Sequence, residues 1–305
     1  MWRFVHLTDP HLAALSDSRG NNILIRSRMP ELISCLRRDL GKLDPRFILA
    51  TGDLVGQHSR DAMYAARDLL DSLGFPYYPV GGNQDFLVRE SRKWFLEAYG
   101  AHLPGNDTYY SFTHENLHMC ILDAWWVWPD GTLCGHRDGP VGNYGWAIPP
   151  HQLKWLQEDL AAHRDMSTLI ALHYPLVPIP ERLRKPGMII YGHLANGDLV
   201  TEILTNSPNV VAVFTGHAHM NFIEEQSGIV HIATSALTEY PAEFRDIHVY
   251  EDRLEVHTMG LSDKSFAALS LVQFNTWTAG EERDRTTVIP LRLKRRGSTR
   301  ARLRS

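Results

Sequence analysis

The chain has 305 residues, of which 44% are hydrophobic and 22% charged, as expected of a globular protein with one large domain or two small ones. Its net charge of -4 argues against a general nucleic-acid-binding surface, its longest apolar runs are too short to cross a bilayer, and its N-terminus lacks the pattern of an export signal. Three widely spaced cysteines, Cys35, Cys120 and Cys134, indicate neither a disulfide framework nor a cysteine-based zinc site, which predicts a cytoplasmic protein.

The first candidate site follows the first predicted strand. Residues 2–7 alternate and then run apolar, and Pro10 prevents the strand from continuing far beyond Thr8. Asp9 and His11 lie two apart in the extended turn that follows, so both side chains can bind one ion. A carboxylate beside an imidazole suits a divalent first-row metal. An ordinary turn aspartate next to a surface histidine is the alternative.

The same arrangement follows the next strand. The apolar run 47–50 predicts a buried strand, and Thr51 and Gly52 end it in a tight turn that brings Asp53 to the sheet edge. Ligands of open α/β sheets bind at this edge, although a carboxylate there can also simply cap the next helix. Helical periodicity over residues 29–43 joins the two strands as a parallel crossover.

A second crossover brings further ligand-type side chains to the edge. Residues 60–73 repeat the helical spacing, and residues 77–80 form a strand before the sequence Gly-Gly-Asn-Gln-Asp. Asn83 offers a carbonyl oxygen, which hard and borderline metals accept. The flanking expectations are a loop at 21–28, a helix at 91–99, and a hairpin of strands at 108–113 and 117–122.

Residues 123–150 are predicted to be a long irregular stretch rich in Gly, Pro and aromatic residues. Its aromatics are Trp125, Trp126, Trp128, Tyr144 and Trp146. A loop of this length in a compact domain is more often functional than idle, so the aromatics can form a lid or a stacking surface. Packing of these side chains into the core is the alternative.

Two later strands end in histidines. His173 follows one of them, and the other ends in Gly-His-Ala-His, where His217 and His219 flank one small residue. A structural role for two adjacent core imidazoles is hard to supply, so this is the most specific single signal in the chain. The elements expected here are a helix at 151–163, a strand at 168–172, a loop at 175–197, a helix at 198–206 and a strand at 209–214.

The last third of the chain is predicted to complete a second sheet packed on the first. Its antiparallel strands are expected at 222–226, 228–233, 246–250 and 253–258. Residues 1–260 then form one domain, and residues 261–289 form an extension that packs on or near it. Residues 290–305 are basic and are expected to be a disordered tail.

The strand ends together supply seven metal-ligand side chains and no cysteine: Asp9, His11, Asp53, Asn83, His173, His217 and His219. This set is too large for one ion and suits two divalent ions if one carboxylate bridges them. Mixed oxygen and nitrogen donors favour Mn, Fe or Zn over Mg or Ca. Two ions about 3.5 to 4 Å apart promote in-line attack at phosphorus, because they lower the pKa of a shared water and neutralise the phosphoryl oxygens. The residues therefore predict hydrolysis of a phosphate ester.

The ordered motifs DxH, GD, GN, H and GHxH resemble those of the calcineurin-like metallophosphoesterase superfamily over roughly residues 2–260. The resemblance implies an α/β (α+β) fold in which two packed mixed sheets are flanked by helices as a four-layer αββα sandwich. It implies a first metal site of Asp9, His11, Asp53 and His219, and a second of Asp53, Asn83, His173 and His217, with a bridging hydroxide as nucleophile. The opening DPHL, the segment QLKWLQEDL and the later IATSAL resemble the class III cyclic-nucleotide phosphodiesterases.

One position departs from the superfamily pattern. The third motif normally reads GNH, and its histidine contacts the phosphate and assists the leaving group, whereas this chain has Gln84. A glutamine amide donates a hydrogen bond but cannot transfer a proton, so His58 or His193 would have to substitute. The form GNxDFL also resembles the UDP-diacylglucosamine pyrophosphatases, whose diphosphate leaving group needs less help. The resemblance makes Asn83, Gln84 and His173 the candidate catalytic residues.

Three functions remain open. The first is a dimetal phosphodiesterase acting on a nucleotide-like or other small diester. The second is a pyrophosphatase or phosphomonoesterase acting on another phosphorylated metabolite, such as a nucleotide-sugar diphosphate. The third is a metal-binding scaffold with little turnover, which Gln84 keeps possible and the complete set of ligand positions disfavours. The expected partner is a small-molecule phosphate ester, with no membrane span and no nucleic acid, and the oligomeric state is left open.

Overall fold

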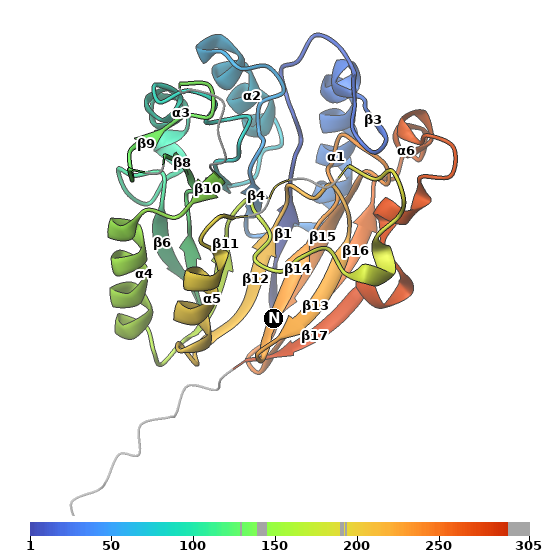
Figure 1. Cartoon of the computed structure of the whole chain (residues 1–305). Coiled ribbons are helices and arrows are strands. Elements are labelled where there is room, and N and C mark those ends of the chain that lie inside the picture. Colours follow the sequence, from blue (N-terminus) through green and yellow to red (C-terminus); the bar gives the residue numbers. More distant parts are fainter. Residues whose placement is uncertain (129, 139–144, 190–191, 193, 292–305) are drawn as a thin grey trace, which may run out of the picture.

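Two six-stranded mixed sheets pack against each other in the computed structural model, which describes residues 1–128, 130–138, 145–189, 192 and 194–291 (Figure 1). The first sheet has the spatial order β17 (Thr286–Pro290), β16 (Arg253–Gly260), β15 (Glu243–Val249), β1 (Trp2–Leu7), β4 (Ile48–Thr51) and β5 (Tyr77–Val80). The second has the order β13 (Phe222–Gln226), β14 (Ile229–Ala233), β12 (Val210–Thr215), β11 (Ser167–Ala171), β7 (Leu117–Ile121) and β6 (Tyr110–His114).

The first half of the chain builds the first sheet by two crossovers. Strands β1, β4 and β5 are parallel neighbours. They are joined through α1 (Met29–Leu43) and α2 (Arg60–Asp71). The Ser59 side chain caps α2 by accepting a hydrogen bond from the Ala62 backbone N–H at 3.1 Å. Both predicted crossovers are therefore confirmed.

The second sheet is parallel in its middle and antiparallel at its edges. Strands β7, β11, β12 and β14 run parallel, and the edge strands β6 and β13 pair antiparallel with their neighbours. Helices α4 (Pro150–Ala162) and α5 (Gly197–Thr205) lie on one outer side of the molecule, away from α1 and α2 (Figure 1). The αββα sandwich is confirmed.

The core between the two sheets is made by alternate residues of their strands. On β1, Phe4 faces this core, whereas Val5 belongs to the cluster that the helices cover. Phe214 and Ile247 join Phe4 in the central cluster, and each is fully buried. Burying a side chain of this size stabilises the fold by roughly 1.5–3 kcal/mol, so this seam fixes how the two sheets face each other.

Only two of the four predicted C-terminal strands complete the second sheet, which corrects the prediction for the last third of the chain. Strands β13 and β14 extend the second sheet, whereas β15 and β16 extend the first. Alternation in the sequence identifies a strand and its buried face but not the edge that it joins. The connection at 234–242 crosses from one sheet to the other.

Residues 123–150 are more regular than the sequence indicates. They contain a three-stranded sheet in the order β10 (Gly145–Ala147), β8 (Trp125–Val127) and β9 (Leu133–Cys134). Trp126 pairs with Trp146 on one side and with Cys134 on the other. Strands of two or three residues are too short for a recognisable alternation, and Tyr144 lies outside the described residues.

The remaining elements are short. They are β2 (Ser18–Arg19), β3 (Ile23–Leu24), α3 (Ser91–Tyr99), α6 (Ser265–Ser270) and the 3-10 turns η1 (Arg26–Arg28), η2 (Gly100–His102), η3 (Glu181–Leu183), η4 (Thr276–Ala279) and η5 (Glu282–Asp284). The predicted loop at 21–28 thus holds β3 and η1, and β17 after α6 pairs antiparallel with β16. Within the described residues, no helix is both long enough and apolar enough to cross a membrane. The predicted tail lies outside those residues from position 292 onward.

Candidate dimetal site

The seven predicted ligands meet where the parallel strands of both sheets end. The loops after β1, β4 and β5 approach from the first sheet, and those after β11 and β12 approach from the second. Six of the seven side chains are buried, and Asn83 is half-buried. The structure therefore brings the whole predicted set together.

One group is centred on Oδ1 of Asp9. The Nε2 atom of His219 lies 3.2 Å from it, and Nε2 of His11 lies 3.9 Å from it. Oδ2 of Asp53 completes the group at 3.9 Å from Nε2 of His11. The nearest ligand atoms of these four residues all lie within 4.8 Å of one another, which is compact enough to hold one ion.

A second group surrounds Nε2 of His173. This atom lies 3.1 Å from Oδ1 of Asn83, 3.4 Å from Oδ1 of Asp53 and 3.2 Å from Nδ1 of His217. Asp53 therefore presents one oxygen to each group. A carboxylate shared in this way is suited to bridge two ions, as the resemblance implied.

The charges of these side chains fit divalent cations. Burial, together with the charge of His219, lowers the pKa of His11 to about 3, and burial also lowers the pKa of His173, so neutral imidazoles face the centre. Burial and the charge of Asp9 raise the pKa of Asp53. Oδ1 of Asp9 is buried and accepts no hydrogen bond from the described residues. Lone pairs and carboxylates that converge without a donor are the environment in which a cation is stabilised.

The backbone at these ligands is strained. Five of the seven residues have positive φ: Asp9 at 49°, His11 at 43°, Asp53 at 48°, His217 at 63° and His219 at 51°. Left-handed backbone costs a residue other than glycine on the order of 1 to 3 kcal/mol and clusters at functional sites. Such repeated strain in the turns after β1, β4 and β12 indicates that function, and not stability, determines these turns.

Two glycines allow the ligand loops to approach closely. A Cβ atom on Gly82 would collide with the backbone nitrogen and Oδ1 of Asp53, and one on Gly216 would collide with the Thr8 side chain and with Oδ2 of Asp9. The motifs GN and GH therefore need their glycine for space beside a ligand carboxylate.

A family model described as calcineurin-like phosphoesterase matches residues 3–221. The chain belongs to this family. It is 24% identical over 234 residues to the 3',5'-cyclic adenosine monophosphate phosphodiesterase CpdA of Haemophilus influenzae, covering 77% of this chain and 76% of the relative. It is 23% identical over 253 residues to the glycerophosphodiester phosphodiesterase GpdQ of Enterobacter lignolyticus, covering 81% and 82%.

Solved structures agree on the fold. A dimetal phosphatase from Danio rerio superposes with a TM-score of 0.68 at 19% identity, over 85% of this chain and 96% of that one. The protein is thus a metal-dependent phosphoesterase, with a buried Asp/His cluster that can bind metal.

Hydrogen bonds behind the ligands orient the imidazoles of this phosphoesterase. Nδ1 of His173 donates to the backbone oxygen of Thr51 at 2.9 Å, and Nδ1 of His219 donates to Oε2 of Glu239 at 2.5 Å. The Nε2 lone pairs of both rings are thereby left for the centre. Glu239 is fully buried and also accepts from the backbone N–H of Asn22. No sequence motif marks Glu239, because it lies between strands of different sheets and outside every motif.

Replacing Glu239 with glutamine is expected to weaken binding of the ion held by His219. The loss of such an outer carboxylate typically costs 10- to 100-fold in metal affinity. Titration of activity with Mn²⁺ should show this as a raised half-saturating concentration, with most of the maximal rate restored by excess metal. Glu251→Gln, at an exposed position, is the matched control. An unchanged metal titration would exclude this role for Glu239.

The main chain at Gln84 has a separate structural role. Its N–H donates to Oδ1 of Asp53 at 2.7 Å. The neighbouring Asp85 carboxylate is buried and accepts from the N–H groups of Leu54, Val55 and Gly82 at 3.2, 3.0 and 2.8 Å. These bonds tie the loop after β5 to the loop after β4 and hold the Asp53 carboxylate in place.

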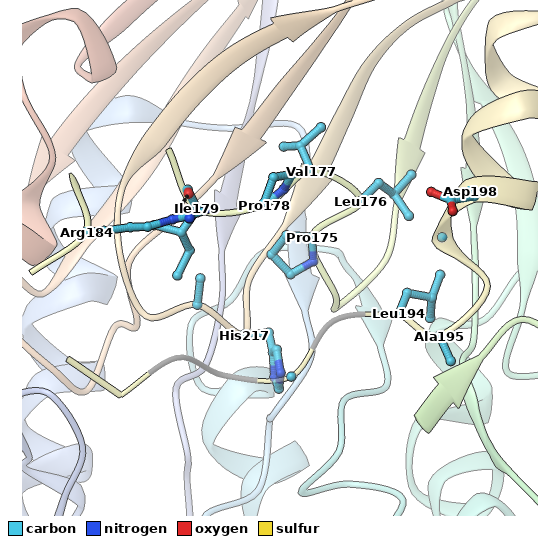
Figure 2. A pocket seen from close by; sticks show the side chains of 13 residues that line it. Pro175, Leu176, Val177, Pro178, Ile179, Arg184, Leu194, Ala195, Asp198 and His217 are labelled. Carbon is cyan, nitrogen blue, oxygen red and sulfur yellow. Dashed lines mark hydrogen bonds between the residues drawn. The ribbon is translucent and has the colours of Figure 1, made fainter. Parts of the chain in front are cut away.

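Two cavities open beside the second group of ligands. One, of about 450 Å³, has the apolar wall Pro175, Leu176, Val177, Pro178 and Ile179, with Arg184 and Asp198 at opposite ends (Figure 2). The other, of about 550 Å³, is lined by Asn83, Gln84, Leu87, Trp126, His136, Gly145 and Trp146. Both linings include Gly192, Ala195 and His217, so the cavities meet at a candidate metal-ligand histidine. We call them the proline arm and the tryptophan arm.

Two of the aromatics of residues 123–150 combine the two roles predicted for them, a cavity wall and core packing. Trp126 is half-buried and Trp146 is buried, and both line the arm as well as packing in or against the core. Of the two histidines named as substitutes for the family's third-motif histidine, only His58 lies in the described part of the chain. His58 bonds to Ser91 Oγ at 2.7 Å and is absent from the described lining, and His193 lies outside the described residues. His136, which the sequence did not single out, lines the arm instead.

Proposed function

We propose that this protein is a phosphodiesterase for a nucleotide-like or other small diester. The observation that carries the proposal is the pair of arms that meet at His217. The phosphorus of a diester carries two organic substituents, and a phosphate held at the junction can place one of them in each arm. A monoester would leave one arm without an occupant. The printed names of CpdA and GpdQ, both phosphodiesterases, support the same choice.

The residues that would hold two divalent ions follow from the two groups described above. Asp9, His11, Asp53 and His219 would hold the first, and Asp53, Asn83, His173 and His217 the second. Their nitrogen and oxygen donors suit Mn, Fe or Zn. When bound, such ions activate water and neutralise charge on the phosphoryl oxygens. The chain's own contribution is the fixed spacing of these ligands and the bridging position of Asp53.

The proline arm is suited to the substituent that stays on phosphorus. Its apolar wall excludes water along one side. At its end, Arg184 can donate hydrogen bonds to a polar or anionic edge of that group (Figure 2). The Arg184 Nε donates to the backbone oxygen of Ile179 at 2.8 Å, which fixes the guanidinium against this wall.

The tryptophan arm would receive the leaving group. Among the described residues that line it, His136 has the one imidazole that is not a candidate metal ligand, and an imidazole is the usual proton donor of hydrolytic sites. The ring of His136 lies edge-on to Trp126, with ring centroids 4.5 Å apart, which orients it within the arm. His136 would protonate the departing oxygen, and the Gln84 amide would donate a hydrogen bond to a phosphoryl oxygen.

A pyrophosphatase acting on a nucleotide-sugar diphosphate is the second candidate, and Gln84 is the observation that favours it. A diphosphate leaves without needing a proton, so an amide in place of an acid would cost that reaction little. A scaffold without turnover accounts poorly for five ligands held in strained backbone.

A substrate panel tests the proposal. The Mn²⁺-loaded protein should show its highest kcat/KM on diesters, measured with bis(p-nitrophenyl) phosphate and cyclic nucleotides against p-nitrophenyl phosphate and nucleotide-sugar diphosphates. Preference for a sugar diphosphate with inert diesters would select the second candidate. Two bound metals with no turnover on any member would select the scaffold.

A further inference from the structure

A second group of metal-ligand side chains lies on the outer face of the first sheet. On β15, Ile247 faces the core between the sheets, so its neighbours Asp246 and His248 point to the opposite face. On β16, Val256 faces the same core, which turns Glu255 and His257 outward. These four outward residues, Asp246, His248, Glu255 and His257, form what we call the outer-face cluster.

The pairing of the two strands makes the cluster compact. His248 lies directly opposite Glu255, and Asp246 lies directly opposite His257. The imidazole ring centroids of His248 and His257 are 4.9 Å apart. The ligand atoms that His248, Glu255 and His257 offer all lie within 4.8 Å of one another. Two imidazoles and a carboxylate at this separation can bind one ion without any change of backbone.

Two further side chains orient these donors. His248 Nε2 donates to Oδ2 of Asp246 at 2.8 Å, which leaves the Nδ1 lone pair of His248 for an ion. Arg253 Nε donates to Oε1 of Glu255 at 2.8 Å, while Oε2 faces Nε2 of His257 at 3.8 Å. A histidine held by a carboxylate behind it is the usual outer support of a metal site.

The cluster is open to solvent, and one carboxylate oxygen of Asp246 beside it accepts no hydrogen bond from the described residues. The side chains of His248, Glu255 and His257 are 20, 23 and 38% exposed, so an ion can enter and keep water ligands. Oδ1 of Asp246 is buried and has no hydrogen-bond partner in the described part of the chain. Oδ2 of Asp246 also accepts from Nη1 of Arg3 at 3.3 Å, so Asp246 supports the cluster and is not counted among its ligands.

A third group, made of His118, Cys120 and Asp159, has its ligand atoms already engaged in hydrogen bonds. Oδ2 of Asp159 accepts from His118 at 2.6 Å and from the Cys120 thiol at 3.0 Å. Nδ1 of His118 is paired with Thr113 Oγ1 at 3.0 Å, and Ser111 donates to Oδ1 of Asp159 at 2.8 Å. Through these hydrogen bonds the group links the second sheet to α4, which accounts for its polar side chains without a metal ion.

We propose that the outer-face cluster binds one divalent transition-metal ion of the zinc, nickel and copper type, separately from the dimetal site. Imidazole nitrogens with carboxylate oxygens select these borderline ions over Mg²⁺ and Ca²⁺. His248, Glu255 and His257 are the ligands, and Asp246 orients His248. The ion links β15 to β16 and stabilises the hairpin that follows the crossing segment with Glu239.

The test compares Zn²⁺ binding by calorimetry in the full-length protein and in His248→Ala/His257→Ala, both already loaded with Mn²⁺. Both proteins keep the same dimetal site, so the difference isolates the outer-face cluster. The unaltered chain should bind one equivalent more than the double variant, and Zn²⁺ should raise its melting temperature more. Glu255→Gln, which removes a ligand oxygen but preserves shape, should weaken this site by at least about tenfold, since changes behind a ligand already cost 10- to 100-fold.

His151→Ala removes an exposed histidine outside the cluster and is the control. Equal zinc stoichiometry in the unaltered chain and the double variant, or an equal loss in His151→Ala, would overturn the proposal. Activity on bis(p-nitrophenyl) phosphate is measured in parallel. It should be the same in the double variant and the unaltered chain, which also shows that the variant is folded. A loss of activity without a change in zinc stoichiometry would contradict the separation of the two sites.

Discussion

Asp53→Asn is expected to abolish phosphoester hydrolysis and to remove both metal ions. Oδ1 of Asp53 faces His173 at 3.4 Å and Oδ2 faces His11 at 3.9 Å, so a single substitution withdraws a negative ligand from each group. Two-metal assistance supplies several kcal/mol of transition-state stabilisation, so kcat/KM should fall by at least about 10³-fold. Metal content by elemental analysis and turnover of bis(p-nitrophenyl) phosphate measure the two effects together.

The controls separate a lost bridge from a lost fold. Asparagine has nearly the shape of aspartate, so the metal-free variant should melt close to the metal-free unaltered protein. Asp252→Asn changes an exposed aspartate and should leave metals and activity unchanged. His11→Ala withdraws a ligand from one group and should leave one ion in place. Two retained metals with near-normal turnover in Asp53→Asn would rule out the bridging position.

The parts of the site that could be predicted are those encoded locally. Each predicted ligand follows a buried strand within a few residues, and parallel strands end at one edge of a sheet whatever the rest of the chain does. The order of strands, turns and ligands therefore predicts Asp9, Asp53 and Asn83 as neighbours at the edge of the first sheet. The structure adds the backbone strain at these turns, which motifs alone do not reveal.

The parts that could not be predicted depend on contacts between distant segments. Glu239 bonds to His219 across a segment that leaves one sheet for the other, and no local pattern marks it. His136 lies in a stretch whose short strands carry no readable alternation. It lines the arm just after β9, which pairs with β8, and its ring lies against Trp126. The assignment of β15 and β16 to the wrong sheet has the same origin, since the sheet that a strand joins is decided by partners far away in sequence.

His136→Ala is expected to slow hydrolysis in proportion to how poor the leaving group is. If His136 protonates the departing oxygen, esters with alkoxide leaving groups should lose on the order of 10²- to 10⁴-fold in kcat, the usual contribution of a positioned general acid. Esters of p-nitrophenol should lose little, because that anion leaves without a proton. The measurement is kcat across a series of diesters graded by leaving-group pKa, in which the variant should show a steeper dependence than the unaltered protein.

Gln84→His provides the complementary test at another residue that lines the tryptophan arm. A histidine there supplies a second proton donor, so in the His136→Ala background it should raise kcat for poor leaving groups and flatten the dependence again. His58→Ala is the control, because His58 is held by Ser91 outside the arm and should not affect the slope. An unchanged slope in His136→Ala would show that His136 is not the general acid. If alkoxide diesters are then inert and a nucleotide-sugar diphosphate is turned over rapidly, the leaving group never required a proton, and Gln84 marks a pyrophosphatase.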